Sequence, residues 1–275
     1  MTYREALRHG EQILAQAGIC DAKNDAWLLL EMVCRIDHNF YYLHIDEDMD
    51  EEQNLEFASL INKRAEHVPL QYITGEQEFM GHIFHVNSYV LIPRQDTETL
   101  VEEALKRVQP GMHVLDLCTG SGCVLVSILK NASGLTGTGI DISKQAVLTA
   151  KENAKFNAVT AEFERSDLFE NVSGQFDMIV ANPPYIPTGE IVKLMPEVAQ
   201  FEPFEALDGK EDGLFFYRRI LKEYPPYLKE KGWLLMEIGC NQARKVTAMM
   251  KQAGFEEVSV VQDLAHLDRV VLGHL

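Results

Sequence analysis

The sequence predicts an α/β protein built on a mostly parallel sheet of seven strands, with a small all-helical segment before it. Two observations lead to this class. From residue 111 onward, apolar runs typical of buried strands alternate with helical stretches, the pattern of a sheet covered by helices on both faces. Residues 1–75 instead keep helical spacing and contain no proline before Pro69. The predicted strands lie at residues 113–117, 136–141, 159–165, 176–181, 233–238, 255–261 and 268–272.

The first 75 residues are expected to form a compact helical domain. Apolar residues recur at helical spacing in three stretches, residues 3–17, 21–34 and 50–66. The segment carries 6 Lys and Arg against 14 Asp and Glu, so its net charge is 6 − 14 = −8. We interpret its acidic cluster, Asp46 to Glu52, as a solvated loop and helix N-terminus, where carboxylates favour the helix dipole. Docking of a cationic partner on this cluster is the alternative.

The pattern changes after the helices. Residues 76–94 combine apolar side chains with turn residues such as Gly81 and Asn87, which predicts a β-hairpin linking two domains. A helix is expected next, up to Arg107, with Asp96 or Thr97 as its N-cap. The predicted division is therefore a helical domain at 1–75, a hairpin linker at 76–94 and an α/β domain at 95–275.

Helices and one long loop are expected between the later strands. The predicted helices lie at residues 124–130, 143–156, 211–229 and 241–253. The third of them should be broken by Pro225 and Pro226, because proline cannot continue a helix. Residues 186–211, with their prolines, are expected to form a long loop.

The composition favours a globular protein of the cytoplasm. The chain has 275 residues, 46% of them hydrophobic, which is enough for one large or two ordinary domains. Lys and Arg number 25 against 42 Asp and Glu, so the net charge is 25 − 42 = −17, a poor match to nucleic-acid phosphates. No secretory signal and no apolar run of transmembrane length is visible. Five cysteines without a Cys-x-x-Cys pair favour reduced thiols over metal ligands, so no metal is expected.

A glycine-rich turn follows the first predicted strand of the sheet. Residues Cys118 to Gly122 precede a helical run, so glycines allow close approach of a ligand and helix N–H groups point at it. A dinucleotide fingerprint would place a third glycine at Leu125, and no P-loop lysine follows, which disfavours phosphate binding. Asp141, at the end of the next strand, suits a ribose diol. The pattern favours a nucleoside without phosphate, S-adenosyl-L-methionine above all, over an ordinary βα turn.

The strand at residues 176–181 ends in Asn182-Pro183-Pro184-Tyr185. Two prolines fix the backbone in an extended form and remove two N–H donors, so the strand tip is rigid. Asn182 and the carbonyl of Pro183 can accept the two N–H bonds of a planar NH2 group, and Tyr185 can stack on its face. A strand followed by a stiff turn is the alternative interpretation. The glycine turn, Asp141, Asp167 and Asn182 all follow strands, and ligands of parallel sheets lie at the carboxyl ends of strands.

These motifs resemble the HemK-type glutamine N5-methyltransferases, class I enzymes with a Rossmann-like sheet that modify peptide chain release factors. The resemblance runs from about residue 3 to the end. Beyond the glycine turn, Asp141 and the strand tip, it rests on the more specific segments Pro69–Gly75, Leu91–Glu98, Phe201–Pro203 and Ala206–Gly209. It implies methyl transfer from S-adenosyl-L-methionine to the side-chain amide nitrogen of the glutamine in the Gly-Gly-Gln motif of release factors.

The resemblance also implies a role for each site residue. The substrate glutamine would be held by Asn182, Pro183, Pro184 and Tyr185, with Asn182, Pro183 and Tyr185 catalytic. The cofactor would be bound by Asn182 together with Cys118, Thr119, Gly120, Ser121, Gly122, Asp141, Asp167 and Leu168. Asp141 would bind the ribose hydroxyls, and Asp167 and Leu168 would face the adenine. Many class I enzymes carry glycine at the position of Cys118, where a positive φ would be costly for a residue with a Cβ.

Several alternatives stay open at this point. The same strand tip could hold the amino group of a flipped base in DNA or RNA, although the charge of −17 disfavours it. A ribosomal protein could carry the glutamine instead. A binding module with a vestigial pocket and an NAD-dependent dehydrogenase are further alternatives. We expect a monomer in the cytoplasm, with residues 1–75 recognising the release factor and no direct contact to nucleic acid or membrane.

Overall fold

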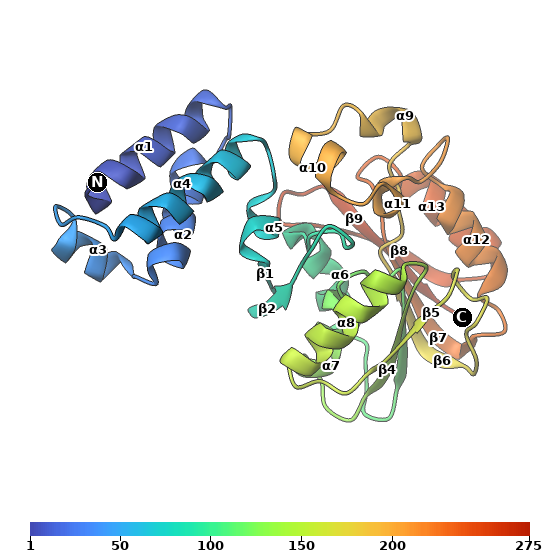
Figure 1. The fold of residues 1–275 in the computed structure, drawn as a ribbon. Helices are drawn as coiled ribbons and strands as arrows, with labels where there is room; N and C mark the ends of the chain where they lie inside the picture. The colour runs from blue at the N-terminus through green and yellow to red at the C-terminus, as the bar shows by residue number, and fades with distance from the viewer. The chain divides into compact units, whose positions relative to one another are not determined.

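A computed structural model describes all residues, 1–275, and they form two compact units (Figure 1). The helical unit comprises Met1–Gly75 and Met195–Phe201, and the sheet unit comprises Glu76–Leu194 and Glu202–Leu275. No helix is long and apolar enough to cross a membrane.

The helical unit is held together by one apolar core and a buried ion pair. Its helices are α1 (Tyr3–Gln16), α2 (Ala22–Cys34), α3 (His38–His44), α4 (Glu51–Ala65), α5 (Leu70–Thr74) and α10 (Pro196–Phe201). Thr2 and Glu5 form a capping box at the start of α1, so two N–H groups of the first turn are satisfied. Arg64 is buried and bonds Asp25 Oδ2 at 2.7 Å and Glu197 Oε1 at 3.1 Å, which fixes α10 to this unit.

The sheet unit contains the predicted seven-stranded sheet and a separate hairpin. The strands of the sheet are β3 (His113–Leu117), β4 (Thr136–Asp141), β5 (Glu162–Arg165), β6 (Phe176–Ala181), β7 (Leu228–Glu237), β8 (Glu256–Gln262) and β9 (Asp268–His274). Their order is β5-β4-β3-β6-β7-β9-β8, and only the pairs that β9 makes are antiparallel. The order in which the chain adds strands therefore reverses between the parallel neighbours β3 and β6. Ligands of such folds bind at this switch point.

Helices cover both faces of this sheet, as the predicted alternation requires. The helices are η1 (Gln95–Thr97), α6 (Glu98–Leu105), α7 (Cys123–Asn131), α8 (Lys144–Phe156), α9 (Thr188–Ile191), α11 (Phe204–Leu207), α12 (Phe215–Glu223) and α13 (Ala243–Gln252). Along β6, Met178 and Val180 join the core under α6, α7 and α8, whereas Ile179 and Ala181 join the core under α12 and α13. Because both faces are buried, β6 is apolar at every core position rather than alternating.

Three expectations about local structure were wrong or incomplete. The hairpin is shorter than predicted, with β1 (Glu76–Phe79) and β2 (His82–His85), and residues 86–94 are irregular. The helix predicted at 211–229 is only α12: the expected break occurs at the prolines, residues 225–227 form a turn, and the strand β7 begins at Leu228. Thr97 is the N-cap residue of α6, as one of the two expectations had it, but its side chain makes no capping bond; its hydroxyl oxygen accepts a bond from Asn182 instead.

Asn153 of α8 joins three parts of the sheet unit. Its Oδ1 accepts a bond from the backbone N–H of His85 at 2.7 Å, and its Nδ2 donates to the carbonyls of His85 at 3.0 Å and Ser121 at 2.9 Å. The side chain has no exposed surface. One amide therefore fixes the end of the hairpin and the glycine turn to the same helix.

We predict that Asn153→Ala lowers the free energy of unfolding by about 3 kcal/mol, because buried backbone groups of His85 and Ser121 lose their partner. Urea denaturation measures this loss. The exposed Lys151→Ala in the same helix is the control and should change the free energy by less than about 0.5 kcal/mol. Equal effects of the two variants would contradict the bridging role of Asn153.

Candidate active site

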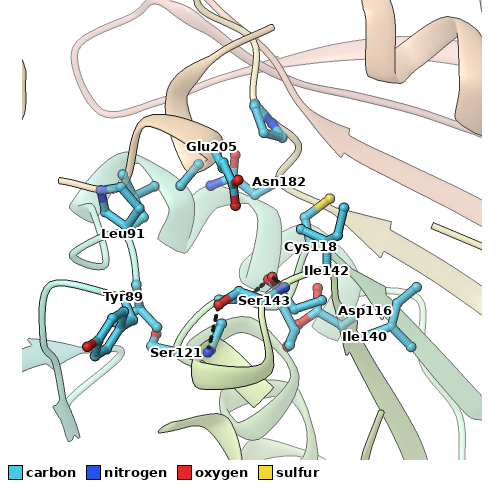
Figure 2. A pocket seen from close by; sticks show the side chains of 18 of the residues that line it. Tyr89, Leu91, Asp116, Cys118, Ser121, Ile140, Ile142, Ser143, Asn182 and Glu205 are labelled. Atoms are coloured by element: carbon cyan, nitrogen blue, oxygen red, sulfur yellow. Dashed lines mark hydrogen bonds between the residues drawn. The ribbon is translucent and has the colours of Figure 1, made fainter. Parts of the chain in front are cut away.

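A cavity of about 360 Å³ lies at the carboxyl ends of the parallel strands (Figure 2). It brings together eight of the residues that the sequence singled out, namely Cys118, Thr119, Gly120, Ser121, Asp141, Asp167, Leu168 and Asn182. Pro184 also lines it, whereas Gly122, Pro183 and Tyr185 do not. The volume falls within the range of small-molecule sites, roughly 300–1,000 Å³.

Three residues of the turn after β3 have a left-handed backbone conformation, and they define the shape of the turn. Cys118, Gly120 and Gly122 have φ of 60°, 54° and 80°, so the costly conformation foreseen at Cys118 is present. A side chain at Gly122 would be strained, because its φ is positive and an added Cβ would lie 3.0 Å from the Cβ of Ala150 in α8. The Thr119 N–H donates to the carbonyl of Ile140 at 2.9 Å. The turn is thus fixed to β4 and α8, and Gly120 and Ser121 face the cavity.

Asp141 is oriented by two backbone donors. The Gly120 N–H donates to Oδ2 and the Ser143 N–H donates to Oδ1, both at 2.9 Å. Burial raises the pKa of Asp141, and the two N–H bonds act against this rise. Each carboxylate oxygen keeps a further lone pair, so the group can accept bonds from two adjacent hydroxyls.

The charges of the cavity suit a cation more than a phosphate. Carboxyl groups of Asp116, Asp141, Asp167 and Glu205 line it. Burial raises the pKa of Asp116 to about 7, and a bond from the Thr119 hydroxyl at 2.6 Å opposes the rise. The two cations of the lining are already paired, Arg94 with Glu202 and Lys210 with Asp208. These donors and acceptors fit a nucleoside with a sulfonium centre, and no free cation faces the cavity to hold a pyrophosphate.

The wall after β5 is also fixed in place. Arg219 of α12 donates to Asp167 Oδ1 at 2.7 Å, and the Ser166 hydroxyl donates to the carbonyl of Leu168 at 2.7 Å. Leu168 has φ of 49° and is buried. An apolar side chain beside a fixed carboxylate offers one flat contact and one acceptor, which matches the needs of an adenine ring.

The strand tip after β6 places one polar side chain at the cavity. Asn182 lines the cavity (Figure 2). Its Nδ2 donates to the Thr97 hydroxyl oxygen at 3.3 Å. The Tyr185 hydroxyl points elsewhere, donating to Glu237 Oε1 at 3.2 Å. The stacking role of Tyr185 and the acceptor role of Pro183 stay predictions.

Two further segments also line the cavity and were not assigned as site residues from the sequence. The irregular segment 88–94 contributes Arg94 and five other residues, among them Tyr89 and Leu91 (Figure 2). Pro203 and the first residues of α11, Phe204 and Glu205 among them, also line the cavity. The sequence did contain a signal for both segments, because Leu91–Glu98 and Phe201–Pro203 are among the motifs on which the family resemblance rests. Their ion pair, Arg94 with Glu202, fixes the two segments to each other.

The comparisons with solved structures agree with the fold. A methyltransferase from Pyrococcus furiosus matches with a TM-score of 0.53 and 14% identity, covering 70% of this chain and 87% of that one. The 16S rRNA N2 G1207 methyltransferase of T. thermophilus, in complex with AdoMet and guanosine, matches with a TM-score of 0.51 and 16% identity, covering 72% of this chain and 49% of that one. Fold and cavity together define a class I methyltransferase dependent on S-adenosyl-L-methionine.

The sequence comparisons narrow this class. Residues 5–75 match the PrmC N-terminal domain, and residues 95–199 match the methyltransferase small domain. A release factor glutamine methyltransferase of Geobacter sulfurreducens is 40% identical over 275 residues, covering 100% of this chain and 97% of the relative. One of Thermodesulfovibrio yellowstonii is 42% identical over 251 residues, covering 88% and 90%. The chain belongs to the release factor glutamine methyltransferase family.

We predict that Asp141→Ala weakens binding of S-adenosyl-L-methionine about 10-fold to 100-fold, because charge-assisted bonds to the ribose are lost. Asp141→Glu should be only partly tolerated, since a longer side chain cannot keep both N–H bonds. Isothermal titration calorimetry measures the affinities. Glu152→Ala, which removes an exposed carboxylate, is the matched control. Unchanged affinity in Asp141→Ala would rule out the ribose role.

Proposed function

We propose that this chain transfers a methyl group from S-adenosyl-L-methionine to the side-chain amide nitrogen (N5) of the glutamine in the Gly-Gly-Gln motif of peptide chain release factors. The observation that carries the proposal is similarity over the whole chain, including both the helical segment and the sheet, to proteins named for this reaction. The cavity adds support, because it combines acceptors for a ribose with an asparagine at its edge.

The chemistry required of the chain is mainly positioning. A bound S-adenosyl-L-methionine supplies an electrophilic methyl group on its sulfonium. The nucleophile, a carboxamide nitrogen, is weak because its lone pair is delocalised. Two acceptors at its hydrogens, Asn182 Oδ1 and the carbonyl of Pro183, would raise the electron density on nitrogen and fix its direction of approach. Such positioning is worth up to roughly 7–11 kcal/mol in favourable cases.

No strong base is needed at the tip. The asparagine is neutral, so it orients the amide without binding it too tightly, and the proton leaves after the methyl group has arrived. A glutamate in place of the glutamine would bring a carboxylate against two acceptors and supply neither N–H donor. The site should therefore reject glutamate strongly.

The helical unit, residues 1–75 with Met195–Phe201, is proposed to recognise the release factor. Stable recognition of a protein usually buries on the order of 1,200 Å² or more, which a strand tip alone cannot supply. The unit exposes acids, including Glu51, Glu52 and Glu56 on α4. Acidic groups speed encounter with a basic region of a partner. We propose that the enzyme acts in the cytoplasm as a monomer and without direct contact to nucleic acid.

We predict that Asn182→Ala lowers kcat by a factor of about 10² or more, using the loss of one transition-state hydrogen bond as a guide. Binding of S-adenosyl-L-methionine should weaken much less. Methylation of a Gly-Gly-Gln peptide, followed by mass spectrometry, gives the rate and the modified residue. Asn241→Ala, an exposed asparagine after β7, is the matched control. Full turnover by Asn182→Ala would exclude the proposed role.

A second prediction concerns the helical unit. The triple variant Glu51→Gln, Glu52→Gln and Glu56→Gln should lower kcat/KM for an intact release factor several-fold at low salt, with the loss shrinking as salt screens the charges. The rate on a short Gly-Gly-Gln peptide should stay unchanged. Three exposed acids of the sheet unit, changed in the variant Glu152→Gln, Glu162→Gln and Glu164→Gln, provide the control. Equal losses on protein and peptide would contradict a recognition role.

A further inference from the structure

A buried glutamine lies behind the strand tip, residues 182–185. Ala181 pairs with Met236 in parallel register, so the turn that joins β7 to α13 follows the sheet at the same edge as the tip. Gln242, the N-cap residue of α13, belongs to this turn and is 7% exposed. Its side chain neither caps the helix nor lines the cavity. A buried amide of this kind must find other partners, because leaving it without hydrogen bonds is costly.

Both donors and the acceptor of the Gln242 amide are used. Its Nε2 donates to the carbonyl of Tyr185 at 2.9 Å and to the carbonyl of Gly213 at 3.1 Å. Its Oε1 accepts from the Gly239 N–H at 3.0 Å, and the Tyr217 hydroxyl lies 3.2 Å from it. Carbonyls only accept and a backbone N–H only donates, so these partners allow the amide one orientation. Gln242 is therefore a fixed donor to the last residue of the strand tip.

Two glycines approach the same backbone group. A Cβ on Gly213 would overlap the carbonyl oxygen of Tyr185. A Cβ on Gly209 would lie 2.8 Å from both the Cα and the carbonyl carbon of Tyr185, whereas carbon atoms in contact are about 3.5–4.0 Å apart. Gly209 has no positive φ, so close approach alone requires glycine there. We call Gly209, Gly213 and Gln242 the tip socket.

Backbone bonds continue this contact beyond Tyr185. The Ile186 N–H donates to the carbonyl of Leu207 at 3.1 Å, and the Gly209 N–H donates to the carbonyl of Ile186 at 2.8 Å. The tip is thus fixed by β6 at one end and by the tip socket at the other. Its two prolines restrict the backbone between these ends, so a shift of Tyr185 is passed on to the rest of the tip.

We propose that Gln242 is a positioning residue: through the tip socket it sets where Asn182 and the carbonyl of Pro183 meet the substrate glutamine. The proposal rests on the proposed function, in which these two groups accept the bonds of the amide NH2. No residue of the socket lines the cavity, so the socket acts through the tip. A misplacement of about 1 Å can cost on the order of 10²-fold in rate, even when its cause lies away from the reacting atoms.

Two substitutions disturb the socket in different ways. Gln242→Glu keeps the shape but loses donors: a carboxylate has none, and a protonated carboxyl group has one where the amide has two. At least one of the two carbonyls then faces an acceptor. Gly209→Ala changes volume instead of polarity, because the added methyl group meets the backbone of Tyr185.

Each substitution has a matched control in the same chain. Gln252→Glu makes the same chemical change at an exposed residue of the same helix, α13. Gly189→Ala, in the loop that follows the tip, adds a methyl group where no atom lies within 4 Å and φ is not positive. Both controls should keep kcat within about twofold of wild type.

The experiment uses the full chain. Isothermal titration calorimetry gives the affinity and the number of sites for S-adenosyl-L-methionine, and methylation of a Gly-Gly-Gln peptide gives KM and kcat per cofactor-binding site. Gln242→Glu and Gly209→Ala should each lower kcat by roughly 10-fold to 100-fold. Peptide KM and cofactor affinity should stay within about threefold of wild type, because the loss falls on alignment in the transition state. The double variant should lose less than the product of the two single losses, since both act on Tyr185.

Wild-type kcat per cofactor-binding site in Gln242→Glu would overturn the proposal. So would a loss of cofactor affinity as large as the loss of kcat, which a general weakening of the sheet unit produces, or losses that multiply fully in the double variant. If Gln242→Glu does not fold, Gly209→Ala against Gly189→Ala still decides. Failure of the proposed function is a separate result, in which wild type itself leaves the Gly-Gly-Gln peptide unmethylated.

Discussion

The parallel pairing of β3 with β6 is the constraint on which the site depends. In this register Leu117 lies opposite Ala181, so both strands end at the same level of the sheet. The glycine turn after β3 and Asn182 after β6 are therefore neighbours, although about 60 residues separate them in the sequence. Pairing of β3 with β4 adds Asp141 to the same edge. Backbone hydrogen bonds between the strands thus bring the glycine turn, Asp141 and Asn182 to one cavity.

Burial gives the carboxyl groups around this edge their character. Asp116, Asp141 and Glu237 all have pKa values raised by desolvation, and each is oriented by a small number of donors. Each of these buried carboxyl groups orients a neighbouring group. Asp116 accepts a bond from Thr119, Asp141 accepts from the Gly120 N–H of the turn, and Glu237 accepts from the Tyr185 hydroxyl. A protein that handles a cationic cofactor gains from acceptors placed before the ligand arrives.

Local sequence was sufficient wherever a residue's role is set by its neighbours in the chain. The apolar run Phe176–Ala181, ended by prolines, predicted β6 with its observed bounds. Local sequence was insufficient where an element is defined by a partner far away in the chain. The residues predicted as helix after Pro225 instead begin the strand β7, because Leu228 pairs with Phe176. The cavity-lining residues at 88–94 and 203–206 show no helical or strand periodicity in the sequence, so only the motifs Leu91–Glu98 and Phe201–Pro203 indicated that they belong to the site.

By itself the sequence determined the fold class, the glycine turn, Asp141 and the asparagine at the strand tip, because glycine, proline and strand-end acids act through local backbone geometry. Only the tertiary structure decided what Thr97 does. The sequence offered it as a helix cap, and it does stand at the N-cap of α6, yet its hydroxyl oxygen accepts a bond from Asn182, 85 residues away. A hydroxyl oxygen accepts from whichever donor lies beside it, and folding, not the local sequence, brings the Asn182 amide to Thr97.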